Sequence, residues 1–240
     1  MDPLTLPAAA ALADLACPER CAACAAVVAR ALLFCHACRA LVNVLGPPEC
    51  AVCGLPRTDR GTCVPCRAPD GDGLRRARAV VAYRGVGAVS PVAQALASFK
   101  YRRVTRLARR LAAAMAARVP DPTIAVVVPV PLHPTRLRAR GFNQSALLAR
   151  HVARALDRPV ALAGLVRTRA TPSQTALTAV ARAANVAGAF AVRDGRALRA
   201  ATVLLVDDVW TSGATLRAAA AALHAGGAVA VDAITFARVL

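Results

Sequence analysis

Residues 203–215 read Val-Leu-Leu-Val-Asp-Asp-Val-Trp-Thr-Ser-Gly-Ala-Thr, and they constrain the fold more than any other segment of the chain. The apolar run 203–206 is typical of a strand that is buried on both faces of a parallel sheet. Asp207 and Asp208 follow at its carboxyl end, before a hydroxyl-rich turn and an Ala/Leu-rich helix. This order predicts an α/β fold with a ligand site outside the carboxyl ends of its strands.

The turn that follows the two acids has the composition of a phosphate-binding turn. The first backbone N–H groups of a helix have no partner inside the helix, so they point at an incoming anion. A glycine permits close backbone approach or a positive φ, and hydroxyl groups add hydrogen-bond donors. The residues expected to bind the phosphate are Thr211, Ser212, Gly213, Ala214 and Thr215.

Asp207 and Asp208 are expected to face sugar hydroxyls, because two ionised carboxylates repel a phosphate. Their targets would be the 2′ and 3′ hydroxyls of a ribose, or a substrate-bound Mg²⁺ that keeps most of its own waters. The segment resembles the ribose-phosphate signature of type I phosphoribosyltransferases, which bind phosphoribosyl pyrophosphate. The alternative is that the acids only end a strand and that Thr-Ser-Gly only turns the chain.

Eight of the nine cysteines form four Cys-x-x-Cys pairs. Two such pairs complete a tetrahedral Cys₄ zinc site, so two zinc ions are expected. Pairing of neighbours gives one site from Cys21, Cys24, Cys35 and Cys38 and another from Cys50, Cys53, Cys63 and Cys66, while interleaved pairing is an alternative. Disulfides, an iron–sulfur cluster or a redox pair fit this repeat less well. Closed Cys₄ sites leave no position for water, so the metal is expected to be structural.

Two domains are predicted. Residues 1–73 would contain a leading helix at 1–16 and the zinc-ribbon module, and residues 74–240 would form the phosphoribosyltransferase-like α/β domain, with the Asp-Gly-Asp-Gly segment 70–73 as a hinge. The second domain holds 25 Lys and Arg against 6 Asp, a net charge of +19, whereas the first has a net charge of −1. Such a charge attracts polyanions. The alternative is compositional, because 30 of the 31 basic residues are arginines, a bias that a GC-rich genome produces.

The sequence gives no sign of a membrane segment or of an export signal. Its apolar stretches are interrupted by arginines before they reach about 18 residues, the length that a membrane-spanning helix needs. The apolar first 16 residues contain two aspartates and no basic start, unlike a signal peptide. A cytoplasmic protein without a membrane span is therefore expected.

Strands and helices alternate through the second domain, which predicts a parallel sheet flanked by helices. Strands are expected at 78–83, 124–130, 160–165, 203–206 and 229–239, and helices at 89–96, 102–118, 144–156 and 216–224. The polar segment 167–174, followed by Arg182, Asn185 and Phe190, is a candidate mobile lid over the site.

Residues 131–144 are predicted to form a basic loop, stiffened by Pro131 and Pro134. Guanidinium groups form bidentate hydrogen bonds with phosphate oxygens, so this loop is a candidate site for pyrophosphate. Its candidate ligands are His133, Arg136, Arg138 and Arg140. Asn143 is the expected N-cap of the next helix. The alternative is a solvated basic loop.

Over nearly its whole length the chain resembles the ComF family, competence-associated proteins with a zinc ribbon and a phosphoribosyltransferase-like domain. The resemblance rests on the order of the motifs, which are the four cysteine pairs, Phe99-Lys100-Tyr101, Pro129-Val-Pro-Leu, Arg140-Gly-Phe-Asn-Gln144, Gln174 with Arg182 and Asn185, and Asp207-Asp208. It implies that the acids and the turn hold the ribose and its 5′-phosphate and that the basic loop holds pyrophosphate. It also implies that Lys100 brings a charge near the substrate. Trp210 departs from the smaller residue usual in the family, so it either crowds the base pocket or packs under the turn.

Two functions follow from this resemblance. The first is a Mg²⁺-dependent phosphoribosyltransferase in which Asp207, Asp208, Arg140 and Lys100 are the catalytic residues. The second is a non-catalytic competence factor that retains the sugar-phosphate pocket and binds single-stranded DNA or proteins of the competence machinery. Binding in the pocket is favoured over catalysis, although stabilisation of the leaving pyrophosphate would allow turnover without a general base.

Overall fold

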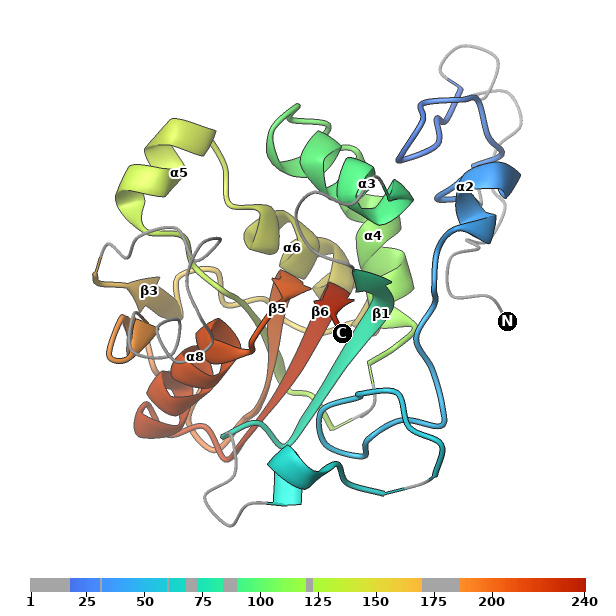
Figure 1. Ribbon diagram of the computed structural model, residues 1–240. Helices are drawn as coiled ribbons and strands as arrows, with labels where there is room; N and C mark the ends of the chain where they lie inside the picture. The colour runs from blue at the N-terminus through green and yellow to red at the C-terminus, as the bar shows by residue number, and fades with distance from the viewer. Residues whose placement is uncertain are drawn as a thin grey trace.

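The structure is a computed structural model that describes residues 18–30, 32–59, 61–67, 73–83, 90–119, 123–169 and 186–240. The predicted leading helix, residues 70–72 of the hinge and residues 170–185 of the candidate lid region lie outside the described residues. The centre of the described fold is a parallel sheet with the strand order β1-β6-β5-β2 (Figure 1). Its strands are β1 (Arg76–Tyr83), β2 (Val126–Pro129), β5 (Thr202–Trp210) and β6 (Ala230–Val239). The predicted fold class is confirmed.

The two central strands, β5 and β6, are covered on both faces, which explains their apolar sequences. The helices α3 (Pro91–Lys100), α4 (Leu107–Ala116) and α6 (Gln144–Leu156) share a hydrophobic core with one face of the sheet. On the other face the core contains α8 (Ala214–Ala225) (Figure 1). In the described part of the chain, no helix has the length and apolar character needed to cross a bilayer.

Local sequence signals explain where the helices begin. In α6 the Asn143 side chain accepts a hydrogen bond from the Ser145 N–H at 3.0 Å, which confirms the predicted N-cap. Ser90 caps α3 in the same way, accepting from the Ala93 N–H at 3.1 Å. In α4 the apolar residues Leu107, Leu111 and Met115 are buried, and Arg110 is buried as well.

The segment after β2 differs from the prediction, because it forms a helix, α5 (Pro134–Arg140), and not a loop. Pro134 occupies its first turn, where the missing N–H costs nothing. Gly141 ends it in the left-handed conformation with φ 84°. The predicted strand 160–165 is reduced to one parallel bridge, between Val160 and Val127 of β2. The strand β3 (Leu165–Arg167) that follows pairs antiparallel with β4 (Phe190–Val192) in a separate sheet.

The cysteine-containing segment packs directly on the edge strand β1. Leu45 donates its N–H to the Val80 carbonyl at 2.9 Å, and Ala82 donates to the Asn43 carbonyl at 2.8 Å. The chain between the second and third Cys-x-x-Cys pairs therefore runs along the free edge of β1. The cysteine-containing segment as a whole also includes the short helices α2 (His36–Ala40) and η1 (Val64–Arg67). The division into residues 1–73 and 74–240 stays a prediction.

Candidate functional site

The eight paired cysteines form two clusters, in the neighbour pairing and not the interleaved one. One cluster contains Cys21, Cys24, Cys35 and Cys38 and the other Cys50, Cys53, Cys63 and Cys66, and within each all sulfur atoms lie within 4.8 Å of one another. Tetrahedral coordination with zinc–sulfur bonds of about 2.3 Å separates sulfurs by about 3.8 Å. The Cys24–Cys35 and Cys53–Cys63 sulfurs are 3.7 and 3.6 Å apart. Both clusters therefore fit structural zinc.

Backbone donors prepare the second cluster for a metal. The N–H groups of Cys53 and Cys63 point at the Cys50 sulfur, at 3.5 and 3.3 Å. Burial alone would raise the pKa of the Cys50 thiol, but these donors and the Val52 N–H outweigh it and lower the pKa to about 6. A thiolate at neutral pH is the form that binds zinc.

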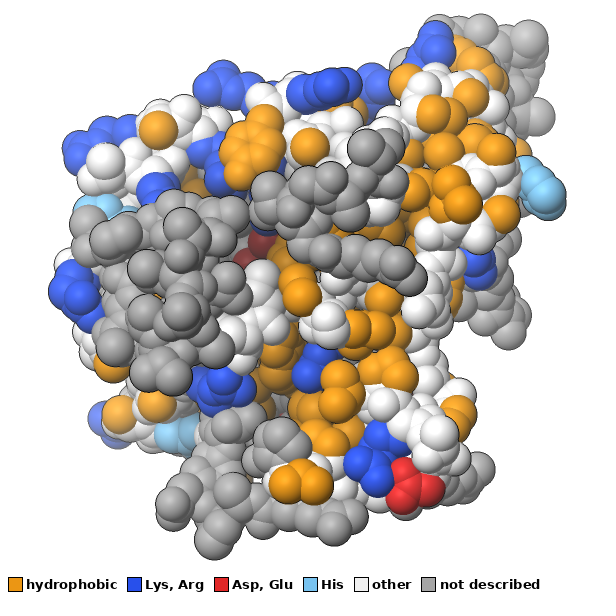
Figure 2. Space-filling model, viewed as in Figure 1, with side chains coloured by type: hydrophobic (Ala, Val, Ile, Leu, Met, Phe, Trp, Pro, Cys, Tyr) orange, Lys and Arg blue, Asp and Glu red, His pale blue; other side chains and the backbone are white. Residues whose placement is uncertain are grey.

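Asp207 and Asp208 lie inside β5, which continues to Trp210, and not beyond the end of the strand as predicted. Both carboxylates are buried. Asp207 Oδ1 accepts hydrogen bonds from the Ser145 hydroxyl at 2.8 Å and from the Asp208 N–H at 2.9 Å. The Asp208 carboxylate forms an ion pair with the Lys100 ammonium group. Figure 2 shows acidic side chains recessed near the centre of the face, with Lys and Arg side chains above them.

The two motifs around residues 99–101 and 140–144 meet beside the acids. Phe99 packs against Phe142 with ring centroids 6.1 Å apart. The Arg140 guanidinium lies 5.4 Å from the centre of the Tyr101 ring. Arg140 also donates to Gln144 Oε1 at 2.8 Å, which fixes the guanidinium at the end of α5. The structure thus brings Arg140 and Lys100 to the same region.

The environment shifts the pKa of two charged groups at this site. Burial, followed by the neighbouring charge of Asp208, raises the pKa of Asp207 to about 7. Burial alone would lower the pKa of Lys100, but attraction to Asp208 and Asp207 outweighs it and raises that pKa. Lys100 is therefore charged at neutral pH, while Asp207 keeps its proton to a higher pH than an ordinary carboxyl group does.

The predicted phosphate-binding turn leads from β5 into α8. Gly213 is the N-cap of α8 with φ 79°, a conformation that favours glycine. A Cβ atom at this position would lie 2.9 Å from Nε1 of Trp210, so the indole packs directly under the turn. Arg217 donates to the Ser212 carbonyl at 2.5 Å and braces the turn from the first turn of the helix. Thr211 is exposed, and Ser212 and Thr215 are half-buried.

The helical form of α5 changes the predicted ring of arginines. Arg136 and Arg140 are four residues apart, so they share a face of the helix, and both are half-buried. Arg138 is exposed on another side, so the three guanidinium groups do not ring one anion from a loop. His133 is the N-cap of α5, and its Nδ1 accepts from the Thr135 N–H at 3.3 Å.

Arg167, the first residue of the predicted lid segment 167–174, also lies near the site. It is buried at the end of β3, with its guanidinium 5.3 Å from the centre of the Phe190 ring. Burial, followed by the positive charge of Arg136, lowers its pKa, and the charge of Asp207 opposes this. Arg167 is therefore a further cation near the acid pair and α5. No motif marks it, because its contacts come from distant parts of the chain.

The raised pKa of Asp207 predicts a pH-dependent stability. Because the folded protein holds this proton more tightly than the unfolded chain, stability from this residue falls as pH rises from about 4 to about 7. The variant Asp207→Asn removes this dependence. Its stability relative to the native protein is expected to rise between about pH 5.5 and pH 7 and then to level off. Denaturant unfolding across this range measures it, with Asp157→Asn at an exposed position as the control; a flat difference for Asp207→Asn would contradict the assigned shift.

A parallel α/β domain with a buried acid pair next to a glycine-led turn, joined to two Cys₄ clusters, defines a class: a double zinc ribbon with a phosphoribosyltransferase-type domain. Family models agree with it. A phosphoribosyl transferase domain matches residues 143–239, and a double zinc ribbon domain matches residues 12–67. The two matches, with the zinc ribbon first and the phosphoribosyl transferase domain second, support the resemblance of this chain to the ComF family.

Individual relatives match different shares of the chain. It is 27% identical to competence protein ComFC of Bacillus subtilis (strain 168) over 219 residues, 85% of this chain and 83% of that protein. It is 37% identical to DNA utilization protein YhgH of Escherichia coli (strain K12) over 114 residues, 48% and 49% of the two proteins. Competence protein F of Haemophilus influenzae is 37% identical over 91 residues, 38% of this chain and 40% of that protein. The last two matches span about half or less of the relatives' length.

Proposed function

We propose that this protein binds phosphoribosyl pyrophosphate together with Mg²⁺, as a phosphoribosyltransferase-type domain carried on a zinc ribbon. Asp207 and Asp208 hold the 2′ and 3′ hydroxyls of the ribose. The turn Thr211, Ser212, Gly213, Ala214 and Thr215 binds the 5′-phosphate through its backbone N–H groups and hydroxyls. The single observation that supports this best is a buried acid pair, fixed by Ser145 and Lys100, in the strand that leads directly into this turn.

The basic side chains around the acids suit the pyrophosphate group. Arg136 and Arg140 are half-buried and Arg167 is buried, while His133 is the half-buried N-cap of α5 and Arg138 is exposed. Guanidinium groups form bidentate hydrogen bonds with phosphate oxygens, and they stabilise negative charge as it develops on a leaving group. Lys100, charged and next to Asp208, adds a positive charge at the ribose side.

A transfer reaction in this site depends on stabilising the leaving group. The C1′–oxygen bond to pyrophosphate breaks, and the electron pair leaves with pyrophosphate. A base nitrogen forms the new bond to C1′ and gives up its proton, which the departing pyrophosphate can accept. Mg²⁺ carried by the substrate would supply positive charge to the departing group, and Asp207 and Asp208 are the residues that would hold it. Arg140 holds the pyrophosphate, and the acid pair orients the ribose and favours positive charge near C1′.

The names of the relatives point to a role in the handling of DNA. ComFC and competence protein F are competence proteins by name, and YhgH is named for DNA utilization. We propose that this chain likewise acts in competence in the cytoplasm, where reduced thiols are available to bind zinc.

The second candidate is a non-catalytic factor that binds single-stranded DNA or competence-machinery proteins. One observation favours it. Arg193, Arg196 and Arg199 are exposed around a hollow of about 520 Å³ that precedes β5, at the opposite end of that strand from the acid pair. The backbone phosphates of single-stranded DNA would bind to such a surface, and this binding would weaken as the salt concentration rises.

Calorimetric titration with phosphoribosyl pyrophosphate and Mg²⁺ tests the proposed function. Saturable binding that is weakened by omitting Mg²⁺, with ribose 5-phosphate binding more weakly, is the expected result. Release of pyrophosphate with any member of a panel of nucleobases would add turnover to binding. Absence of binding, together with salt-sensitive binding of single-stranded DNA, would favour the second candidate.

A further inference from the structure

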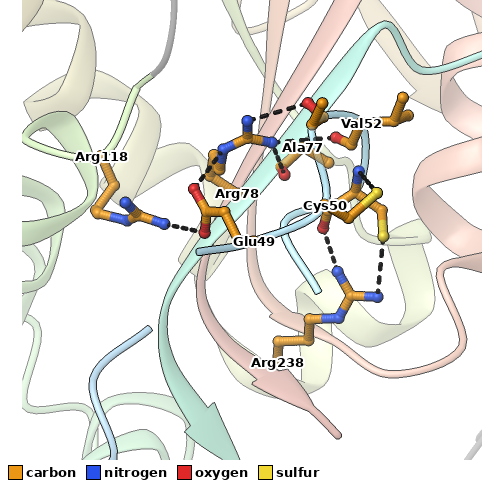
Figure 3. A network of polar contacts seen from close by, with 9 residues as sticks. Glu49, Cys50, Val52, Ala77, Arg78, Arg118 and Arg238 are labelled. Atoms are coloured by element: carbon orange, nitrogen blue, oxygen red, sulfur yellow. Dashed lines mark hydrogen bonds and ion pairs between the residues drawn. The ribbon is translucent and has the colours of Figure 1, made fainter. Parts of the chain in front are cut away.

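The second cysteine cluster is held on the sheet by two arginines from neighbouring strands (Figure 3). Arg78 of β1 donates to the carbonyl groups of Ala51 at 3.0 Å and Val52 at 3.1 Å. Arg238 of β6 donates to the Cys53 carbonyl and lies 3.7 Å from the Cys53 sulfur. A zinc ion with four thiolates carries a net negative charge, so these guanidinium groups also stabilise the site.

Arg238 differs from Arg78 because it has a second contact, with the phosphate-binding end of β5. Its guanidinium carbon lies 4.5 Å from the centre of the Trp210 ring, and the two residues are register partners in β5 and β6. Its Nε atom is buried without a hydrogen-bond partner among the described residues. The cysteine cluster and the indole therefore determine where this guanidinium lies.

Trp210 in turn supports the turn that is proposed to bind the 5′-phosphate. The indole is buried, and its Nε1 and Cε2 atoms would be 2.9 and 3.1 Å from a Cβ atom at Gly213. The space between the indole and the turn is therefore too small for even an added methyl group, so the indole lies directly against the turn. A continuous series of contacts thus runs from Cys53 through Arg238 and Trp210 to Gly213.

The first cysteine cluster has a different attachment. It shares a core with the opposite face of the sheet, and Arg110 of α4 holds it by donating to the Arg20 carbonyl at 2.8 Å. Trp210 belongs to the core of the second cluster and not to that of the first. The two clusters are therefore matched in chemistry but not in their connection to the site.

We propose that Arg238 and Trp210 are positioning residues that couple metal occupancy of the second cysteine cluster to the geometry of the turn 211–215. Loss of the metal frees Cys53, so Arg238 loses the acceptor that holds it over the indole. Trp210 and the turn then shift, and the sugar phosphate binds less tightly. The effect on ligand affinity rests on the proposed function, whereas the effect on Trp210 does not.

Trp210 reports on this coupling directly, because it is the single tryptophan of the chain. The matched variants are Cys66→Ser and Cys38→Ser, each at the half-buried fourth cysteine of its cluster. Each is expected to retain one zinc ion in place of two. A shift of the fluorescence emission is expected for Cys66→Ser and not for Cys38→Ser, and Arg238→Met should abolish the response to Cys66→Ser. Equal emission shifts in the two cysteine variants would overturn the proposal.

Affinity for phosphoribosyl pyrophosphate with Mg²⁺ provides the second readout. Cys66→Ser and Arg238→Met are each expected to weaken binding about tenfold, and the double variant no further, as for residues in one network. Arg238→Met should retain both zinc ions. Its affinity therefore tests whether Arg238 positions the turn even if Cys66→Ser does not fold. Arg78→Met, which loses contacts to the same cluster but none to Trp210, should change affinity less than about twofold.

Two outcomes separate the coupling from the proposed function. Additive losses in the double variant, or an equal loss in Arg78→Met, would overturn the coupling while leaving ligand binding intact. If the native protein does not bind phosphoribosyl pyrophosphate, the proposed function fails, and the emission of Trp210 alone then confirms or overturns the coupling.

Discussion

Asp208→Asn is expected to weaken the binding of phosphoribosyl pyrophosphate by about a hundredfold or more. Asp208 is buried and paired with Lys100, so its carboxylate is held in place before the ribose arrives. Each charge-assisted hydrogen bond to a ribose hydroxyl contributes about 1.5–3 kcal/mol. Loss of two such bonds corresponds to at least about a hundredfold in the dissociation constant. The substitution also leaves the ammonium group of Lys100 without its partner carboxylate.

Calorimetric titration of the native protein and of two variants measures this effect. Asp194→Asn is the matched control, because Asp194 is exposed and precedes β5 at the opposite end from the site. Circular dichroism establishes that both variants are folded. Native affinity in Asp208→Asn, or an equal loss in Asp194→Asn, would show that the acid pair does not hold the ribose.

Glu49→Gln is expected to lower the free energy of unfolding by about 3–5 kcal/mol. Glu49 lies beside Cys50 and forms ion pairs with Arg78 at 3.0 Å and with Arg118 at 2.5 Å (Figure 3). All three side chains are at most 15% exposed. Removing the carboxylate leaves two guanidinium groups poorly solvated and close to each other, which costs more than the loss of an exposed pair.

Denaturant unfolding of Glu49→Gln and Asp59→Asn makes this comparison. Asp59 pairs with Arg57 at 2.6 Å, but its side chain is 60% exposed, so its loss should cost less than about 1 kcal/mol. Zinc content should be measured in both variants, because Glu49 precedes a metal ligand. Equal costs in the two variants would mean that the buried network does not tie the second cluster to the sheet.

The parts of the fold that local sequence determines were predictable. Cys-x-x-Cys spacing gave both metal clusters, because two ligands come from one turn. Asn143 correctly predicted the start of α6, because an N-cap acts within three residues. Gly213 correctly predicted the turn before α8. The α5 helix was missed, because Pro134 and Gly141, which bound it, also punctuate loops.

The contacts that assemble the site could not be predicted, because they join residues far apart in the chain. Ser145 reaches Asp207 over 62 positions, and Arg238 reaches Cys53 over 185. The length of β5 has the same origin, since pairing of Trp210 with Arg238 continues the strand past the acids. Sequence patterns showed which residue types were present, but only the fold shows that Lys100 pairs with Asp208.

A crystal structure of the complex with phosphoribosyl pyrophosphate and Mg²⁺ would show whether the acid pair and the turn hold this ligand. We expect the 2′ and 3′ hydroxyls to lie within hydrogen-bond distance of Asp207 and Asp208, and the N–H groups of residues 211–215 to surround the 5′-phosphate. A phosphate bound elsewhere, with the acid pair still facing only Ser145 and Lys100, would contradict this expectation.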